Sequence, residues 1–147
     1  VNALGGYLSV NATEAPQKSI LVVDSGTALT FCYVTKDGIY KGGIILPGLS
    51  LSSLALTEYT AKIPLTYVSP TDEIIGRSTK EAVEIGLYQG FIHMINGFIA
   101  QYKQMDPDLT VIGTGKGLEI MNDKLELDLF DPQLIHRGLA YISDYYV

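Results

Sequence analysis

A carboxylate, a glycine and several hydroxyls follow one another where an apolar stretch of the sequence ends. The stretch Ile20–Val23 leads into Asp24, and the sequence continues Ser-Gly-Thr-Ala-Leu-Thr as far as Thr30. Glycine lets backbone N–H groups approach phosphate oxygens, threonine adds donors, and aspartate can hold a cation that neutralises phosphates. The segment therefore predicts a phosphate-binding turn. A plain β-turn, whose polar side chains bond the local backbone, explains the same residues.

A second apolar stretch also runs straight into a glycine-rich turn. Leu109–Ile112 precedes Gly113–Gly117, which reads Gly-Thr-Gly-Lys-Gly. A turn before a short helix can cradle phosphate or approach a nucleoside closely, because helix N-termini attract anions. The spacing is not that of a Walker loop, which is longer and ends in Lys-Ser/Thr. A permissive strand-to-helix turn is the alternative explanation.

The other reactive residue types form no pattern typical of a metal or nucleophile site. His93 and His136 fall on two separate helical patterns, with no Cys or second His at ligand spacing. Cys32 alternates within an expected strand, which is typical of a small core residue. No Ser/His/Asp grouping follows from the spacing.

Composition excludes several classes of protein. The 147 residues carry ten Lys and Arg against sixteen Asp and Glu, so the formal charge is −6 and no electrostatic nucleic-acid binder is expected. Hydrophobic residues make up 47%, which is typical of a globular domain. No stretch approaches the roughly 18 apolar residues of a membrane helix. A single cysteine cannot form an internal disulfide, so we expect a cytoplasmic protein.

The elements that must position the two turns can be read from periodicity and turn residues. Alternation and the Lys-Asp-Gly turn at 36–38 predict an antiparallel meander of three strands. Later segments predict helices and two further strands on a mixed sheet with helices on both faces. The expected strands are 20–24, 28–35, 39–46, 109–112 and 125–130, with a short extended piece at 65–68, and the expected helices are 49–61, 78–105, 118–122 and 131–145.

Glycines within two of these elements carry expectations of their own. Gly42 and Gly43 in the third strand predict a bulge or a close backbone approach. Three more lie in the long helix, where each costs about 1 kcal/mol relative to alanine, so we expect close packing of that helix against the sheet or another helix. These three are Gly86, Gly90 and Gly97.

Five motifs in order resemble the type III pantothenate kinases, and the resemblance covers nearly the whole chain. The element order is likewise that of the ribonuclease-H-like half of the actin-like kinases. The motifs are Asp24–Thr30, the stretch Gly42–Gly48 (Gly-Gly-Ile-Ile-Leu-Pro-Gly), Thr60–Pro64, Gly76–Thr79 and Gly138-Leu139. The resemblance implies an α/β ribonuclease-H-like (actin-like ATPase) domain that phosphorylates pantothenate with ATP, the first step toward coenzyme A.

The resemblance also implies roles for particular residues. Asp24 resembles the ligand of a monovalent cation, K⁺ or NH₄⁺, and ATP is expected with Mg²⁺. Similar kinases are homodimers, and we place the contact on helix 78–105, with Phe91, Met94, Phe98 and Tyr102 on its surface. The residues similar to nucleotide contacts are Gly26, Thr27, Gly113 and Gly115, and those similar to pantothenate contacts are Thr79, Gly43 and Gly48. A turn, a cap or a bulge is the alternative role for each.

The departures from the family pattern are as informative as the matches. The Gly-x-Asp-Arg motif, whose Asp is the proposed general base, is absent and is expected upstream of Val1. Residues 1–18 are therefore interpreted as the tail of an upstream element and 19–147 as the C-terminal kinase domain. We expect the 147-residue chain alone to be inactive. The turn at 113–117 also departs from the usual Thr-Gly-Gly.

Two other interpretations stay open. One is another actin-like small-molecule kinase, such as a sugar or acetate kinase. The other is a noncatalytic homologue that acts as an accessory transcription-factor-like regulator, through a protein partner or a nucleotide-sensing state rather than through direct contact with DNA.

Overall fold

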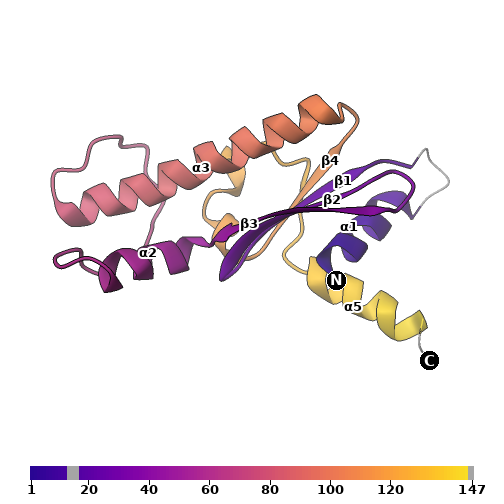
Figure 1. Ribbon diagram of the computed structural model, residues 1–147, viewed down its shortest axis with the longest axis horizontal. Helices are drawn as coiled ribbons and strands as arrows, with labels where there is room; N and C mark the ends of the chain where they lie inside the picture. Colours follow the sequence, from indigo (N-terminus) through magenta and orange to yellow (C-terminus); the bar gives the residue numbers. More distant parts are fainter. Residues whose placement is uncertain (13–16, 146–147) are drawn as a thin grey trace.

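Five strands form one mixed sheet in the order β3-β2-β1-β4-β5 (Figure 1). The structure, a computed structural model, describes residues 1–12 and 17–145. β1 pairs antiparallel with β2 and parallel with β4, β2 pairs antiparallel with β3, and β4 pairs parallel with β5, which confirms the expected meander. The elements are α1 (Asn2–Asn11), β1 (Ile20–Ser25), β2 (Ala28–Val34), β3 (Tyr40–Pro47), α2 (Leu49–Glu58), α3 (Thr79–Met105), β4 (Thr110–Thr114), α4 (Lys116–Glu119), η1 (Asn122–Lys124), β5 (Leu129–Phe130) and α5 (Leu134–Tyr145).

β1 is buried on both faces because helices cover both sides of the sheet. Leu21 and Val23 belong to the larger apolar cluster, under α3, while Ile20 and Val22 belong to a smaller one that includes residues of α1 and α5. These four side chains are at most 1% exposed. Burial of one such side chain stabilises the fold by about 1.5–3 kcal/mol. The strand is therefore a rigid support for the polar residues at its end.

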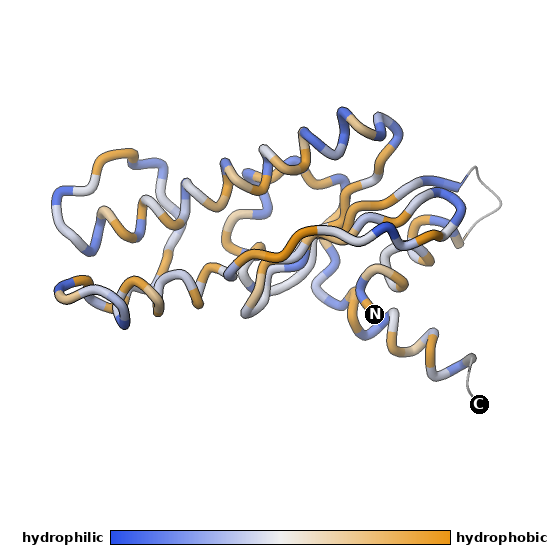
Figure 2. Tube along the Cα trace, in the orientation of Figure 1, coloured by the Kyte–Doolittle hydropathy of each residue, from blue (hydrophilic) through white to orange (hydrophobic). Residues whose placement is uncertain are grey.

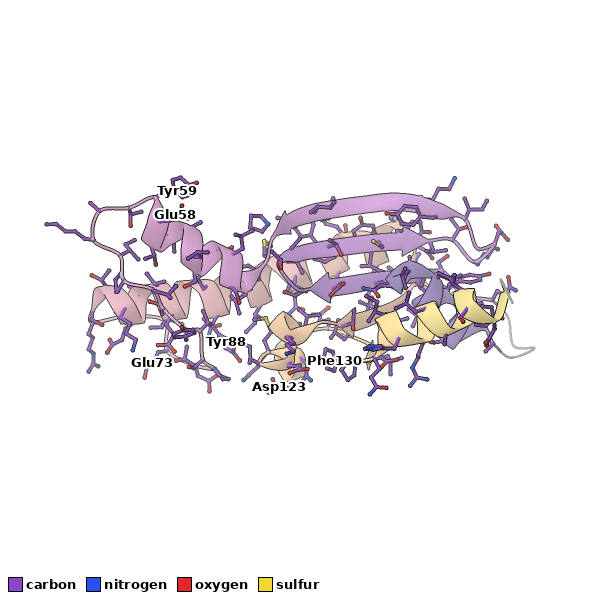
Figure 3. All side chains as sticks on the ribbon, turned by 90° about the horizontal axis from the view of Figure 1, so that it is seen from below. Glu58, Tyr59, Glu73, Tyr88, Asp123 and Phe130 are labelled. Carbon is purple, nitrogen blue, oxygen red and sulfur yellow. The ribbon has the colours of Figure 1, made fainter. Side chains whose placement is uncertain are left out.

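α3 lies along one face of the sheet and begins where the sequence predicted. Ser78 Oγ accepts a hydrogen bond from the Glu81 N–H at 3.2 Å. The Glu81 carboxylate in turn accepts from the Arg77 N–H at 2.7 Å, one residue before the usual partner of a capping box. Further along, the Tyr88 hydroxyl donates to the Ile120 carbonyl at 3.3 Å and joins α3 to the segment after β4 (Figure 3).

The aromatic surface that we assigned to a subunit contact on α3 lies against the sheet instead. Phe91 is 7% exposed and is part of the larger cluster, and Met94 packs against that cluster. The rings of Phe98 and Tyr102 have centroids 5.2 and 6.1 Å from two aromatic rings of β2. Phe91 is thus part of the core under α3, and the other three are half-buried at its edge, because helical spacing cannot by itself tell which apolar residues the sheet will cover.

The glycines of α3 form an exposed row. A Cβ atom at Gly86, Gly90 or Gly97 would meet no described atom within 4 Å. The expectation of close packing at these positions is therefore wrong within this chain. The sheet instead takes up the larger side chains on the other side of the helix, such as Ile95 and Ile99, which are fully buried.

The N-terminal segment folds against the sheet as α1. A Cβ atom at Gly6 would lie 2.7 Å from the Val22 side chain, and one at Gly5 would lie 2.6 Å from the backbone of α5. Two consecutive glycines thus allow α1 to lie directly on α5 and on β1, at the end of the molecule where both termini are found (Figure 1). The expected upstream tail, residues 1–18, includes this packed helix, while its residues 13–16 lie outside the described part.

The structure shows both the close backbone approach and the bulge that the two glycines of β3 predicted. A Cβ atom at Gly43 would overlap the carbonyl of Phe31 on β2, so the two strands approach closely there. Gly42 has a φ of +98° and lies where the register between β2 and β3 shifts. The stretch from Gly43 to Gly48, which resembles a loop near the pantothenate pocket, belongs to β3 as far as Pro47, and Gly48 is the N-cap of α2.

The far edge of the sheet is shorter than the pattern at 125–130 predicted. Asn96 on α3 holds this segment: its Nδ2 donates to the Lys124 carbonyl and its Oδ1 accepts from the Glu126 N–H, each at 2.9 Å. Groups bonded to a helix side chain are not available for strand pairing, so only β5 forms. The extended piece expected at 65–68 is likewise not a strand.

Apolar residues follow the strands, but some also gather in the segment between α2 and α3 (Figure 2). This segment, residues 59–78, projects beyond the sheet (Figure 1). Its exposed large residues include Tyr59, Leu65, Tyr67, Ile74 and Ile75. Among the helices of the described residues, none has the length and apolarity needed to cross a membrane.

Candidate functional site

The two turns that the sequence singled out meet at one edge of the sheet. β1 and β4 are parallel neighbours, and Asp24 is in register with Thr114. The next residue, Gly115, has a φ of +93°, and a Cβ atom on it would lie 2.5 Å from the Ser25 carbonyl oxygen and 2.6 Å from Asp24 Oδ1. Only glycine fits both this φ and this space. The second turn therefore lies directly against the first.

Asp24 lies on the side of the sheet that faces α1. Asn2 of α1 donates a hydrogen bond from Nδ2 to Asp24 Oδ2 at 2.6 Å. Burial raises the pKa of the Asp24 carboxyl, and the hydrogen bond from Asn2 opposes this rise. Within the described residues, no Lys or Arg forms a salt bridge with Asp24. A bound cation would compensate the partly buried charge.

The oxygen atoms near Asp24 suit a hard cation. Asn2 Oδ1 is buried and has no hydrogen-bond partner among the described atoms. Thr30 and Thr114 are the register neighbours of Asp24 on the adjacent strands. Carboxylate, amide and hydroxyl oxygens are the ligands that hard cations prefer. No cluster of three His, Cys, Asp or Glu side chains able to hold a metal occurs in the described part of the chain.

The opposite side of the same strand end carries a hollow of about 430 Å³. Side chains alternate along β1, so Ser25 faces away from α1, toward this hollow. Gly26, Thr27, the first turn of α2 and Lys116 also line it. The Gly48 N–H donates to the Thr27 carbonyl at 2.9 Å, so α2 begins directly on the turn. A helix N-terminus next to a glycine turn and hydroxyls is suited to bind an anion such as phosphate.

Most of the residues that the sequence suggested meet at this edge of the sheet. They are Asp24, Gly26, Thr27, Gly48 and Gly115. Gly26 and Thr27 are exposed at the tip of the turn. At Gly48 a Cβ atom would overlap the carbonyl of Gly26, so this glycine is required by the approach of α2.

Three of the suggested residues lie elsewhere. Gly113 is adjacent to the site but buried, and a Cβ on it would lie 2.5 Å from the Leu127 side chain. Gly43 pairs with Cys32 inside the sheet. Thr79 is the exposed first residue of α3, in the part of the molecule that projects beyond the sheet (Figure 1). Ser78 serves as the helix cap, so Thr79 is not needed for that role.

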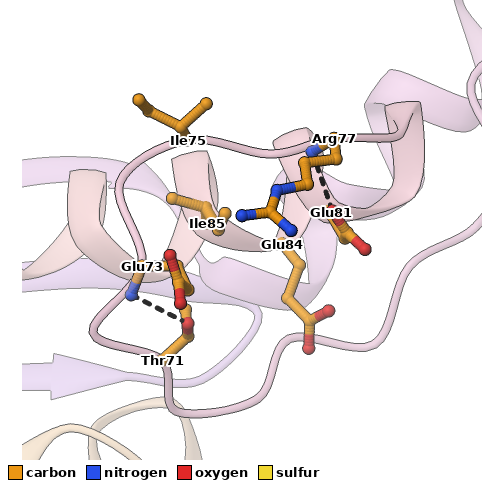
Figure 4. Close-up of a pocket in the computed structure, with 7 residues that line it drawn as sticks. All are labelled: Thr71, Glu73, Ile75, Arg77, Glu81, Glu84 and Ile85. Carbon is orange, nitrogen blue, oxygen red and sulfur yellow. Dashed lines mark hydrogen bonds between the residues drawn. The ribbon is translucent and has the colours of Figure 1, made fainter.

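A separate hollow of about 310 Å³ lies between residues 71–77 and the first turns of α3 (Figure 4). Arg77 extends over it, and the carboxylates of Glu73, Glu81 and Glu84 line it. The Glu73 N–H donates to Thr71 Oγ1 at 3.1 Å, which shapes the loop. Its acidic lining distinguishes it from the hollow beside Thr27, where the lining residues include no Asp or Glu.

Sequence reasoning missed two participants in the site. Asn2 contacts Asp24 from a helix 22 positions away in the sequence, and no local pattern signals such a contact. Lys116 was noted only as part of an unusual glycine turn, yet it lines the hollow with Thr27. Its position follows from the start of α4 against β1, which only the three-dimensional structure reveals.

The sheet order and the paired turns define an actin-like, ribonuclease-H-like domain. A crystal structure of a conserved Campylobacter jejuni protein, whose description groups it with the Baf family, has a similar fold with a TM-score of 0.58 and 21% sequence identity. The similarity covers 90% of this chain and 59% of that one, and it bears on the fold alone.

The chain belongs to the type III pantothenate kinase family, whose sequence profile matches residues 6–101. Relatives named Type III pantothenate kinase include those of Listeria monocytogenes serotype 4a (strain HCC23), 36% identical over 144 residues, and Phenylobacterium zucineum (strain HLK1), 37% identical over 144 residues. The alignments cover 95% and 97% of this chain but 56% and 54% of the relatives. The chain thus spans about half the length of these relatives.

Proposed function

We propose that the protein containing this chain is a cytoplasmic kinase that transfers the γ-phosphoryl group of ATP to the primary hydroxyl of pantothenate, the first step of coenzyme A synthesis. The observation that carries the proposal is the meeting of the Asp24 turn and the Gly115 turn at one sheet edge, in a chain of this family. The residues of this edge provide a carboxylate on one side and, on the other, a hollow whose lining is suited to an anion.

The two sides of the edge suggest a division of roles. Asp24 and Asn2 Oδ1 would hold a monovalent cation, K⁺ or NH₄⁺, and Gly26, Thr27 and Gly115 would bind ATP phosphates that carry Mg²⁺. The cations neutralise charge on the transferring phosphoryl group. The strand ends keep the donors in place before reaction, so no reorganisation is needed when charge develops.

The pantothenate site is proposed to include Thr79, Gly43 and Gly48. Thr79 is exposed and free of a capping role, so its hydroxyl is available to a ligand. Gly48 adjoins the phosphate turn through the Thr27 carbonyl. The general base that accepts the proton of the attacking hydroxyl is expected outside residues 1–147.

A homodimer is part of the proposal, with the contact on the exposed row of α3. Gly86, Gly90 and Gly97 leave space beside the helix backbone that a second helix can enter. The segment 59–78, next to the start of α3, adds exposed apolar side chains such as Ile74 and Ile75, which are 80% and 73% exposed. Exposed apolar surface of this kind is typical of protein interfaces.

The test is ADP release by the full-length protein with ATP and Mg²⁺, with and without pantothenate, in potassium and then in sodium. We expect release that requires pantothenate and potassium. Asp24→Ala should lower kcat/KM about 100-fold or more, as loss of a group that stabilises the transition state electrostatically does. Asp37→Ala, in the exposed turn between β2 and β3, is the control variant. A folded protein that binds ATP without releasing ADP would instead favour a regulator of the same fold.

A further inference from the structure

The hollow beside Thr27 continues into a second one, and one lysine stands at the junction. The second hollow, about 420 Å³, lies between α2 and residues 65–68. Both hollows are lined by Leu49, Ser50, Leu54, Lys116 and Gly117, so they form one groove. Volumes of this size are typical of small-molecule sites.

The two ends of the groove differ in chemistry. At one end lie the hydroxyl-bearing turn 25–27 and the start of α2. At the other end, Leu65, Tyr67, Val68 and Ile120 present a mainly apolar wall. Ser53 Oγ, which is buried, donates to the Thr66 carbonyl at 2.5 Å and fixes this wall to α2. The groove therefore has a polar end and a mainly apolar end.

Among the described residues that line the two hollows, Lys116 is the only one with a charged side chain. It is exposed and takes part in none of the salt bridges of the described residues. An uncompensated ammonium group in a groove without carboxylates attracts an anion.

Two independent features make one end of the groove suited to an anion. α2, ten residues long, has no side-chain cap and no acidic residue in its first turn, so its first N–H groups are available. Ser25, which is 1% exposed, lines the same hollow, and its hydroxyl has no hydrogen-bond partner among the described atoms.

We infer that the groove binds the nucleotide lengthwise and that Lys116 pairs with a phosphate at its middle, next to the nucleoside. This inference rests on the proposed kinase function and adds a positioning residue to it. Lys116 makes the site selective for a nucleoside that carries phosphates over the bare nucleoside. The apolar end takes the base, and the α2 N-terminus with the Ser25 and Thr27 hydroxyls takes the outer phosphates.

The experiment measures calorimetric affinities of the full-length protein for ATP and for adenosine at two salt concentrations. We expect Lys116→Met to weaken ATP binding about tenfold, the loss of one charged hydrogen bond, and to leave adenosine binding unchanged. The salt dependence of ATP binding should also fall in this variant. Lys116→Arg should keep most of the affinity for ATP. The matched control is Lys41→Met, which replaces an exposed lysine of β3 outside the groove.

Unchanged ATP affinity in Lys116→Met, or an equal loss for ATP and adenosine, overturns the role of Lys116. Pantothenate-dependent ADP release by the wild-type protein, assayed in parallel, separates this failure from failure of the kinase proposal. A wild-type protein that binds ATP with the expected dependence on Lys116 but phosphorylates no pantothenate would overturn the kinase proposal alone. A wild-type protein that binds no ATP overturns both.

Discussion

Glycines at the sheet edge and glycines on α3 occupy opposite environments. Near the site, a Cβ atom at Gly48 or Gly115 would overlap backbone or lie within 2.6 Å of it, so neighbouring segments depend on the missing side chain. On α3, a Cβ at Gly86, Gly90 or Gly97 would meet nothing within 4 Å. The same residue type is thus required by its neighbours at one place, whereas at the other no contact with the described residues requires it.

The largest expected effect is at the sheet edge. Gly115→Ala would place a Cβ against Ser25 and Asp24 at a φ of +93°, and strain with overlap should lower the free energy of unfolding by about 2–4 kcal/mol. Urea denaturation measures the change. Gly26→Ala, where a Cβ would meet nothing within 4 Å, is the matched control and should change stability by less than about 1 kcal/mol. Equal losses in both variants would show that the turns do not pack as described.

A substitution in the exposed glycine row of α3 should, in contrast, leave the fold of the chain intact. Gly90→Leu should leave the helical content measured by circular dichroism unchanged, because leucine favours a helix more than glycine by about 0.8 kcal/mol. The same change should convert the proposed dimer to a monomer in light scattering. Lys103→Leu, at a position turned well away from Gly90 around the helix, should keep the dimer. A dimer that persists in Gly90→Leu would remove this row from the subunit contact.

The smallest effect concerns the side of α3 that faces the sheet. The Tyr33 hydroxyl donates to Asp106 Oδ2 at 2.7 Å, and this hydrogen bond lowers the pKa of the Asp106 carboxyl. The contribution of this hydrogen bond to stability is therefore fully present above the pKa of Asp106 in the unfolded chain, about 4. It is lost as the pH falls through the lower pKa of Asp106 in the folded protein. Tyr33→Phe should cost at most about 1 kcal/mol at pH 6.

The control for this acid dependence is the exposed Tyr59→Phe, which should match the wild-type protein at every pH. In denaturation series, the difference between wild type and Tyr33→Phe should shrink as the pH falls below about 4. A difference that stays constant across this range would show that Asp106 does not carry it.

Local patterns predicted the elements and the two turns well. Alternation and the turn at Gly38, with a φ of +78°, were sufficient for the meander, and Ser78 with Glu81 marked the start of α3. Parallel pairing of β1 with β4 is a long-range feature, so the sequence suggested two phosphate turns without showing that Gly115 lies against Asp24. The resemblance to the family motifs led to the proposed roles, which composition and spacing left open.

The remaining parts depend on tertiary contacts that no local pattern encodes. Asn2 reaches Asp24 from another element, and Asn96 replaces strand pairing at 124–126. Phe91 and Phe98 repeat at helical spacing but are covered by the sheet, so the side of α3 that stays exposed was predicted incorrectly.

Amide hydrogen exchange of the full-length protein, with and without ATP in potassium and Mg²⁺, tests the central claim most directly. If the paired turns form the nucleotide site, ATP should slow exchange in peptides that cover 23–29, 48–52 and 113–118, and leave those that cover 70–77 unchanged. Protection confined to the acidic hollow at 71–77, with none at the turns, would contradict the assignment of the site.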